Sequence, residues 1–298
     1  MYYYYQICGL HVRFEIPWAV KVTEESKPFL LASGTSVQPD VTVRFSGVDS
    51  LSLPDTDGFW NVNSYYLAGD REQRVWHCPL RNETPYCCVV WNADCANVLT
   101  CYYVRGQEHQ IPYTRNLLEI LSLETFLLRF DGLILHASVV DWEGKGILFC
   151  APSGTGKSTQ AALWERYKGS RTLNGDRAGI RCEGGIWKAW GLPFAGTSGI
   201  YSNESVPIRA IVLLRQGAEN IITPVQPIEA FKRMLPECSA QRWEAGFMER
   251  LTGVLSALIC DVPMYQLSCR PDLEAVELLR DAIMREIGAA AEIPDDST

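Results

Sequence analysis

The sequence predicts an α/β fold with a separate β-rich region at its N-terminal end. In residues 1–110, apolar side chains alternate with polar ones in short runs, as Val12, Phe14 and Ile16 do, and this period of two is typical of strands. Beyond residue 158, helical patterns alternate with apolar strand patterns, which is typical of an α/β domain. We therefore predict a β-rich domain over 1–112, an α/β domain over 113–288 and a tail over 289–298.

Elements of the second region follow from the spacing of its apolar side chains. Leucines 117, 118 and 121 predict a buried amphipathic helix over 115–130. The apolar runs 133–140 and 146–151 are joined by the turn 141–146, which includes two glycines, and this indicates a β-hairpin. The remaining expected elements are a helix at 159–168, strands at 179–183, 185–190 and 207–216, and helices near 227–236, 243–260 and 271–286.

The charge balance argues against two classes of partner. The 298-residue chain has a net charge of −8, which repels the phosphates of nucleic acids and anionic lipid surfaces. No stretch approaches the roughly 20 apolar residues of a membrane span, and the start lacks the basic segment of a signal peptide. We therefore expect a cytoplasmic protein with no nucleic-acid or membrane partner.

Cysteine usage fits the same compartment. The sequence has eleven cysteines, an odd number, no C-x-x-C pair and four histidines. This pattern favours reduced thiols, mostly used as small buried hydrophobic groups, over disulfides or a structural zinc site.

The most informative segment is Ala-Pro-Ser-Gly-Thr-Gly-Lys-Ser at 151–158, which predicts a phosphate-binding loop. Gly154 and Gly156 allow successive backbone N–H groups to turn towards phosphate oxygens at a helix N-terminus. Lys157 is expected to reach the outer phosphates, and the Ser158 hydroxyl is expected to ligate Mg²⁺. The candidate nucleotide-binding residues are Ala151, Pro152, Ser153, Gly154, Thr155, Gly156, Lys157, Ser158 and Thr159.

The context of this segment agrees with that interpretation, because an apolar strand pattern runs into it and a helical pattern runs out of it. The alternative is a glycine-rich turn before an ordinary helix. A nucleotide with Mg²⁺ is the ligand we predict, and the sequence does not discriminate ATP from GTP.

Residues 133–159 resemble the catalytic domain of HPr kinase/phosphorylase. The shared order is a histidine-containing strand, a short turn with glycine, a second strand and a P-S-G-x-G-K-S type of loop. The resemblance extends over about 130–220, and its wider relative is the phosphoenolpyruvate (PEP) carboxykinase core. It implies a PEP carboxykinase-like P-loop core with a β-hairpin before the phosphate loop, and it also implies a homo-oligomer.

The segment 171–177, Arg-Thr-Leu-Asn-Gly-Asp-Arg, is similar to a strand of that family that ends in Asp-Asp-Arg. By this resemblance, Asp176 is the catalytic base and a Mg²⁺ ligand together with Ser158, Lys157 is catalytic, and His136 orients Asp176 or contacts the γ-phosphate. The Asn-Gly pair taken alone is more typical of a surface turn. Gly175 stands where the family has its first Asp, which implies a kinase without phosphorylase activity.

Residues 190–216 stand in the place of the segment that faces the acceptor substrate in the resembling family. They lack the run of acidic residues that the family has there. The expected acceptor is therefore a hydroxyl group of some other peptide, protein or small molecule. Gly196, Thr197, Ser198 and Gly199 form either a substrate-side loop or a plain connector. We interpret Lys232 and Arg233 as a solvated helix face.

Taken together, the sequence predicts an ATP- and Mg²⁺-dependent, HPr kinase-like phosphotransferase. Two alternatives remain open. A decarboxylating carboxykinase would need Mn²⁺ ligands and substrate-binding arginines that the sequence does not reveal. A non-catalytic accessory protein would use the loop to sense ATP and the β-rich region to bind a peptide or protein partner.

Overall fold

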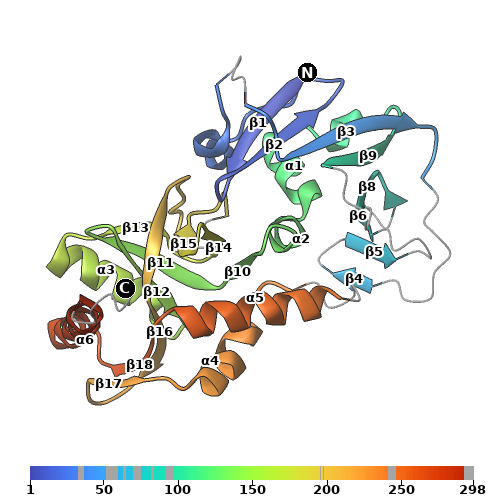
Figure 1. The fold of residues 1–298 in the computed structure, drawn as a ribbon. Coiled ribbons are helices and arrows are strands. Elements are labelled where there is room, and N and C mark those ends of the chain that lie inside the picture. Colours follow the sequence, from blue (N-terminus) through green and yellow to red (C-terminus); the bar gives the residue numbers. More distant parts are fainter. Residues whose placement is uncertain are drawn as a thin grey trace, which may run out of the picture. The chain divides into compact units, whose positions relative to one another are not determined.

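The computed structural model describes residues 1–32, 37–51, 60–62, 65–69, 75–81, 84–91, 97–194, 196, 198–240 and 246–291. By spatial proximity the chain divides into two units, each with its own β-sheet (Figure 1). Unit 1 comprises Met1–Phe130 and Ala240–Arg250, and unit 2 comprises Asp131–Ser239 and Leu251–Thr298. Residues 113–130 thus group with the N-terminal sheet, and a domain boundary near residue 112 stays a prediction.

Unit 1 is built on a sheet with the strand order β1-β2-β3-β9-β8-β6-β5-β4, in which β7 pairs with β6. The first two strands form an antiparallel hairpin. Its turn is Cys8-Gly9, with φ angles of 50° and 77°, as a two-residue type I′ turn requires. The prediction of a β-rich N-terminal region is therefore confirmed. The strands are β1 Tyr2–Ile7, β2 Leu10–Glu15, β3 Val41–Val48, β4 Trp60–Val62, β5 Tyr65–Gly69, β6 Val75–Arg81, β7 Thr84–Pro85, β8 Cys87–Trp91 and β9 Val98–Val104.

The described residues of Met1–Phe130 include the 3-10 helices η1 Glu24–Phe29 and η2 Glu108–Gln110, and the α-helices α1 Thr114–Leu121 and α2 Leu123–Leu128. The expectation of one helix over 115–130 is wrong in one respect. Ser122 adopts a left-handed conformation with φ 52°, and it ends α1 and begins α2. The apolar pattern continues across this break, so both helices bury leucines.

Unit 2 contains a sheet with the order β10-β14-β15-β16-β12-β11-β13, and β18 pairs with both β16 and β17. The prediction of a mixed α/β region is confirmed. The strands are β10 Gly132–Leu135, β11 Ala137–Trp142, β12 Lys145–Cys150, β13 Arg171–Asn174, β14 Ala178–Glu183, β15 Ile186–Trp190, β16 Ser205–Gln216, β17 Ile221–Pro224 and β18 Met264–Cys269. The helices are α3 Lys157–Lys168, α4 Pro227–Met234, the 3-10 helix η3 Leu235–Glu237, α5 Phe247–Asp261, which begins in unit 1, and α6 Leu273–Ala291.

The predicted hairpin is present as β11 and β12. Its turn is shorter than expected, because only Glu143 and Gly144, with φ angles of 52° and 76°, separate the strands. His136 is not in the middle of a strand, as the apolar run suggested. It lies between β10 and β11, which pair with different neighbours.

This break requires the sheet of unit 2 to curl. Strands β10 and β11 are first and sixth in the sheet order, so in a flat sheet they would lie about 24 Å apart at about 4.8 Å per strand. One residue, His136, joins them, and it can span only about 7 Å. The connection from β13, at the far end of the order, to β14 uses only residues 175–177. The two ends of the curled sheet therefore meet at His136 and at residues 175–177.

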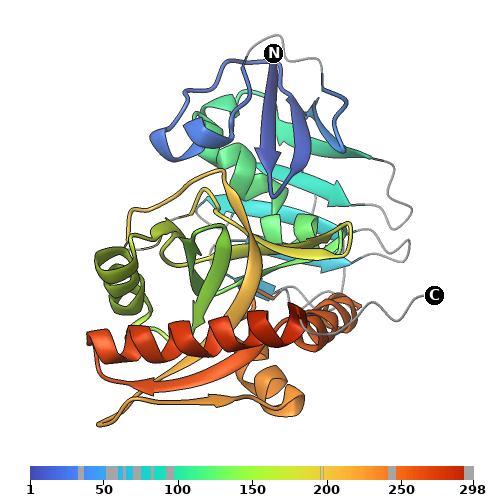
Figure 2. The ribbon, with the colours of Figure 1, turned by 60° about the vertical axis from the view of Figure 1, so that its left-hand side comes forward.

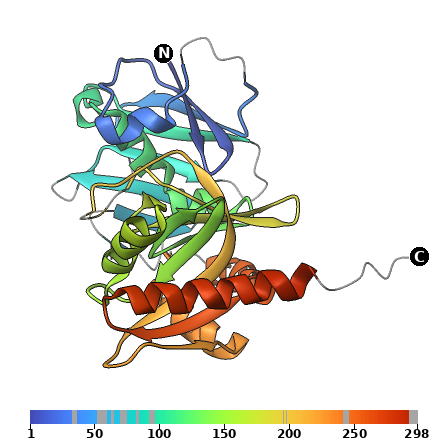
Figure 3. The same cartoon turned by 90° about the vertical axis from the view of Figure 1, so that its left-hand side faces the viewer.

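One face of this sheet is covered by α3 and α6, which also contact each other. Figures 2 and 3 show α6 running alongside β17 and β18. The core between these layers is apolar, and Trp164 of α3 is fully buried in it. The Trp164 ring packs edge-on against the ring of Trp142, with centroids 5.2 Å apart. This packing fixes the helix that follows the glycine-rich loop.

The cysteines that the structure resolves as free are Cys8, Cys87, Cys88, Cys101, Cys150, Cys182, Cys238, Cys260 and Cys269. Most of them are buried, in agreement with the expected use of thiols as core groups. None of the helices within the described residues has the length and apolar composition needed to cross a bilayer.

Replacing Trp164 should separate the contribution of ring packing from that of the indole N–H. The Nε1 atom of Trp164 has no hydrogen-bond partner among the described residues, so Trp164→Phe removes no hydrogen bond. We expect Trp164→Ala to lower the free energy of unfolding by about 3–5 kcal/mol and Trp164→Phe to lower it much less. Urea unfolding followed by circular dichroism measures both. Equal losses in the two variants would contradict this account of the core.

Candidate functional site

The glycine-rich segment lies between β12 and α3. Gly154 and Gly156 have φ angles of 80° and 113°, a region that residues with a Cβ rarely adopt. Gly156 is the N-cap of α3, which begins at Lys157. Both glycines that the motif requires are thus needed for the backbone path. Ser158 and Thr159 are exposed on the first turn of the helix.

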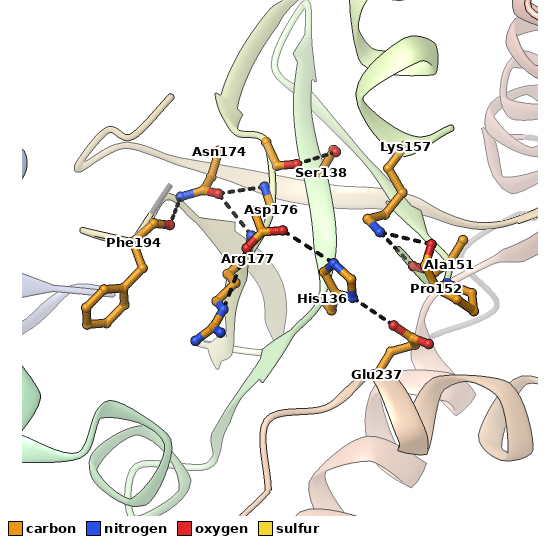
Figure 4. Close-up of polar contacts among 11 residues, drawn as sticks. His136, Ser138, Ala151, Pro152, Lys157, Asn174, Asp176, Arg177, Phe194 and Glu237 are labelled. Carbon is orange, nitrogen blue, oxygen red and sulfur yellow. Dashed lines mark hydrogen bonds and ion pairs between the residues drawn. The ribbon is translucent and has the colours of Figure 1, made fainter. Parts of the chain in front are cut away.

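Lys157 folds back over the loop. Its side chain is only 7% exposed, and Nζ donates hydrogen bonds to the carbonyl oxygens of Ala151 at 2.7 Å and Pro152 at 3.3 Å (Figure 4). Burial lowers the pKa of Lys157, and the nearby carboxylates of Glu237 and Asp176 act in the opposite direction. The ammonium group therefore lies within electrostatic range of both carboxylates.

The turn 174–177 is held by a fully buried amide. The Asn174 Oδ1 atom accepts hydrogen bonds from the backbone N–H groups of Asp176 and Arg177, both at 2.9 Å. Its Nδ2 atom donates to the carbonyl oxygens of Leu192 at 3.1 Å and Phe194 at 3.0 Å. The turn is thus tied to a second segment of the chain, unlike a free surface turn.

His136 lies between two carboxylates (Figure 4). Its Nε2 atom is 3.3 Å from Asp176 Oδ1, and its Nδ1 atom is 2.9 Å from Glu237 Oε2. The backbone N–H of His136 also donates to the carbonyl oxygen of Glu237 at 2.8 Å. The structure therefore brings together two residues that the sequence singled out and one, Glu237, that it did not.

Glu237 has no recognisable signal in the sequence. It ends η3 and is 101 residues from His136. The curl of the sheet explains the meeting, because His136 lies where β10 passes into β11, and Leu135 forms an isolated bridge with Cys238. Only the sheet order places this glutamate beside the histidine.

Two buried thiols lie near the same groups. Burial raises the pKa of Cys150 and of Cys238, the latter to about 12, and the charge of Glu237 adds to both effects. Both thiols are therefore protonated at neutral pH, which disfavours a nucleophilic role for either.

Gly196 and Ser198 pack against the turn that contains Asp176. A Cβ placed on Gly175 would lie 2.5 Å from the Cβ and Oγ of Ser198, and one placed on Gly196 would lie 2.6 Å from Asp176 Cγ. The glycine at 175, where the resembling family has Asp, thus leaves room for Ser198. Thr197, part of the predicted substrate-side loop, lies outside the described residues.

The interpretation of Lys232 and Arg233 as a solvated face is wrong for Arg233. Lys232 is exposed, but Arg233 is half-buried and donates from Nη1 to Gln266 Oε1 at 2.8 Å. Arg233 also lines an open pocket beside the glycine-rich loop. The pattern of charges along α4 did not distinguish these two neighbours.

The described residues contain no cluster of three or more His, Cys, Asp or Glu side chains that could hold a metal. The predicted Mg²⁺ ligands are one hydroxyl group, Ser158, and one carboxylate, Asp176. This small set fits Mg²⁺ in nucleotide sites, where the ion keeps waters and takes its other ligands from phosphates. The exposed Ser158 and the part-exposed Asp176 are accessible for that purpose.

The model of one protein family, SynChlorMet cassette protein ScmC, matches residues 115–270, just over half of the chain. The chain belongs to the ScmC family. The matched range contains the glycine-rich loop, His136, Asp176 and Glu237, so the whole candidate site lies in the part that defines this ScmC-family protein.

No curated protein matches the sequence. Among solved structures, an HPr(Ser) kinase/phosphatase from Coxiella burnetii is similar at 13% identity and a TM-score of 0.31, over 53% of this chain and 92% of that one. So low a TM-score does not establish a shared P-loop core, and assignment of the ScmC-family chain to that core stays a proposal.

The contact between Gly175 and Ser198 can be tested by a paired substitution. Gly175→Ala should lower the free energy of unfolding by about 1–3 kcal/mol, because its Cβ would overlap the Ser198 side chain. Adding Ser198→Gly should recover most of this loss, since it removes the overlapping atoms. Urea unfolding of the single and double variants measures both effects. An equal loss in the double variant would show that the strain lies elsewhere.

Proposed function

We propose that this protein is an ATP- and Mg²⁺-dependent kinase that transfers a phosphoryl group to a hydroxyl acceptor. The observation that supports this most directly is the glycine-rich loop, in which Gly154 and Gly156 have φ angles of 80° and 113° and Gly156 is the N-cap of a helix that begins at Lys157. Phosphoryl transfer needs mainly positioning and charge neutralisation, and this site offers a cation for the phosphates beside a carboxylate for the acceptor.

On the donor side, Lys157 and the backbone amides of 153–158 would hold the phosphates. In the structure Lys157 Nζ bonds to loop carbonyl oxygens, and a bound phosphate would offer it a charged partner in their place. Ser158 and Asp176 would hold Mg²⁺, which when bound neutralises charge on the phosphate oxygens.

On the acceptor side, Asp176 is the proposed base. The acceptor oxygen forms a bond to the γ-phosphorus, the bond from that phosphorus to the bridging oxygen breaks, and ADP leaves. The hydroxyl proton passes to the Asp176 carboxylate. Asn174 supports this role, because its hydrogen bonds to the backbone of 176 and 177 fix the position of the base.

His136 and Glu237 are proposed to position Asp176. The imidazole contacts Asp176 through Nε2 and the Glu237 carboxylate through Nδ1, and the backbone N–H of His136 donates to the carbonyl oxygen of Glu237. Such a carboxylate–histidine pair fixes ring orientation in many enzymes. With Gly175 in place of the family's first Asp, this chain has one base, which fits a kinase without phosphorylase activity.

One observation favours the non-catalytic alternative. Both oxygens of Asp176 have neighbours, since Oδ1 is 3.3 Å from His136 Nε2 and Oδ2 is 3.7 Å from Arg177 Nε. A carboxylate held in this way could be structural in an accessory protein that binds a nucleotide without transferring phosphate.

Nucleotide titration with variants tests the proposed donor site and base separately. We expect ATP with Mg²⁺ to bind the wild-type protein, and Lys157→Ala to abolish binding because it removes the cation of the loop. We expect Asp176→Asn to keep binding but to lose about 10²–10⁴-fold in turnover. Isothermal titration with ATP and GTP, followed by ADP or GDP release with cell extract as the acceptor source, gives both readouts.

The outcomes are distinct. No binding to wild type would refute the donor site, and wild-type turnover by Asp176→Asn would refute the base. Tight binding without turnover in any acceptor fraction would favour the accessory protein. Arg166→Gln is a matched control, because Arg166 is exposed on α3.

Removing the charge of Glu237 tests the positioning role. Glu237→Gln should lower kcat by about 10–100-fold, the effect expected when a hydrogen bond to a charged group is lost, while the KM for ATP stays within twofold. A purely structural role predicts instead a lower melting temperature with no selective loss of kcat. Steady-state kinetics and thermal unfolding of the same preparations separate these outcomes.

A further inference from the structure

An open pocket of about 440 Å³ lies beside the glycine-rich loop. Its volume falls within the roughly 300–1,000 Å³ that small-molecule sites occupy. Three segments of unit 2 form its walls: the first half of the loop, the end of β16 and one residue of α4. The lining residues are Pro152, Ser153, Gly154, Thr155, Leu214, Arg215, Gln216 and Arg233.

The pocket is cationic in a chain whose net charge is −8. Two arginines and no Asp or Glu are among the described residues that line it. Arg215 is exposed, and its side chain has no hydrogen bond or ion pair with any described residue. Arg233 uses one guanidinium nitrogen to bind Gln266, which leaves most of its five N–H donors available. The pocket therefore offers donors and positive charge to an anion.

The topology of the sheet places these arginines next to the loop. Strands β12 and β16 are parallel neighbours, so their carboxyl ends meet at one edge of the sheet, where β12 runs into the loop and β16 ends with Arg215 and Gln216. The Gln216 Nε2 atom donates to the carbonyl oxygen of Gly154 at 3.3 Å, across this edge.

Arg233 belongs to α4, which is followed directly by η3 with Glu237, the residue that contacts His136. Burial and Glu237 raise the pKa of the Cys150 thiol, whereas Lys157 and Arg233 both lower it. The two cations thus lie within range of one buried group at the start of the loop. The loop residues that line the pocket, 152–155, come before the predicted Mg²⁺ ligand Ser158 in the chain, and Ser158 itself does not line the pocket.

We propose that Arg215 and Arg233 bind the terminal phosphate of a nucleoside triphosphate. This inference rests on the proposed function. It adds a specificity for the phosphate donor, because the site would bind a nucleoside triphosphate more tightly than a diphosphate. A guanidinium group matches phosphate oxygens with paired N–H donors. The two arginines would also stabilise the charge that spreads over the transferred group in the transition state.

Binding of ATP, ADP and AMP in the presence of Mg²⁺ tests the assignment in wild type, Arg215→Gln, Arg233→Gln and Arg233→Lys. We expect each Gln variant to weaken ATP binding by about 10-fold or more and to change ADP and AMP binding by less than twofold. Arg233→Lys keeps the charge and should retain part of the ATP affinity. Arg166→Gln is the control for loss of one exposed positive charge.

The failure of this inference differs from the failure of the proposed function. If wild type binds no nucleotide, the kinase proposal and this inference both fall. If wild type binds ATP and both Gln variants bind it equally well, the arginines do not contact the donor, although the kinase proposal stands. If a Gln variant loses the same affinity for ATP, ADP and AMP, the arginines contact the nucleoside or the α-phosphate. If a Gln variant binds ATP as wild type does but turns over more slowly, the pocket binds an anionic acceptor. Either result overturns the assignment to the terminal phosphate. Because Arg215 is exposed and packs in no core, Arg215→Gln keeps the test valid even if Arg233→Gln fails to fold.

Discussion

The closure of the second sheet on itself is the constraint on which the candidate site depends. A single residue, His136, links β10 to β11 across the sheet order, and three residues link β13 to β14. These short links hold only if the two ends of the sheet meet. Asn174 secures the meeting from within, because a fully buried amide must satisfy its donors and acceptor, and here it does so with four backbone groups of two segments. The Asp176 turn is consequently tied to Leu192 and Phe194, and movement of either side would leave buried polar groups unpaired.

Charge is distributed unevenly around this junction. Asp176 and Glu237 flank His136, and Arg215 and Arg233 line the pocket beside the glycine-rich loop. Because the chain as a whole is acidic, a cationic pocket next to a glycine-rich loop is a local feature that the net charge conceals. For the proposed kinase, this arrangement provides cations for the donor phosphates and a carboxylate that accepts a proton. Electrostatic interactions of this kind are stronger where the groups are partly buried than on an open surface.

Two glycines near Asp176 are confined by the side chains around them. Gly175 is confined by Ser198, and Gly196 is confined by the Asp176 carboxylate. A side chain at 175 would therefore require Ser198 to move. The glycine at 175 is accordingly required by the packing around Asp176.

The sequence by itself determined the local parts of this protein: the β11–β12 hairpin, the glycine-rich loop with Gly154 and Gly156, and the helix that begins at Lys157. These depend on apolar periodicity and on backbone conformations within a few residues, which a sequence records directly. The resemblance added Asp176 and His136 as candidates, although it placed His136 within a strand. Only the tertiary structure decided that Glu237 contacts His136, that Arg233 lines a pocket with Arg215, and that Gly175 lies against Ser198. These pairs join residues far apart in the chain, 101 residues in the case of Glu237 and His136. Their meeting depends on the order and curl of the strands, for which no local pattern exists.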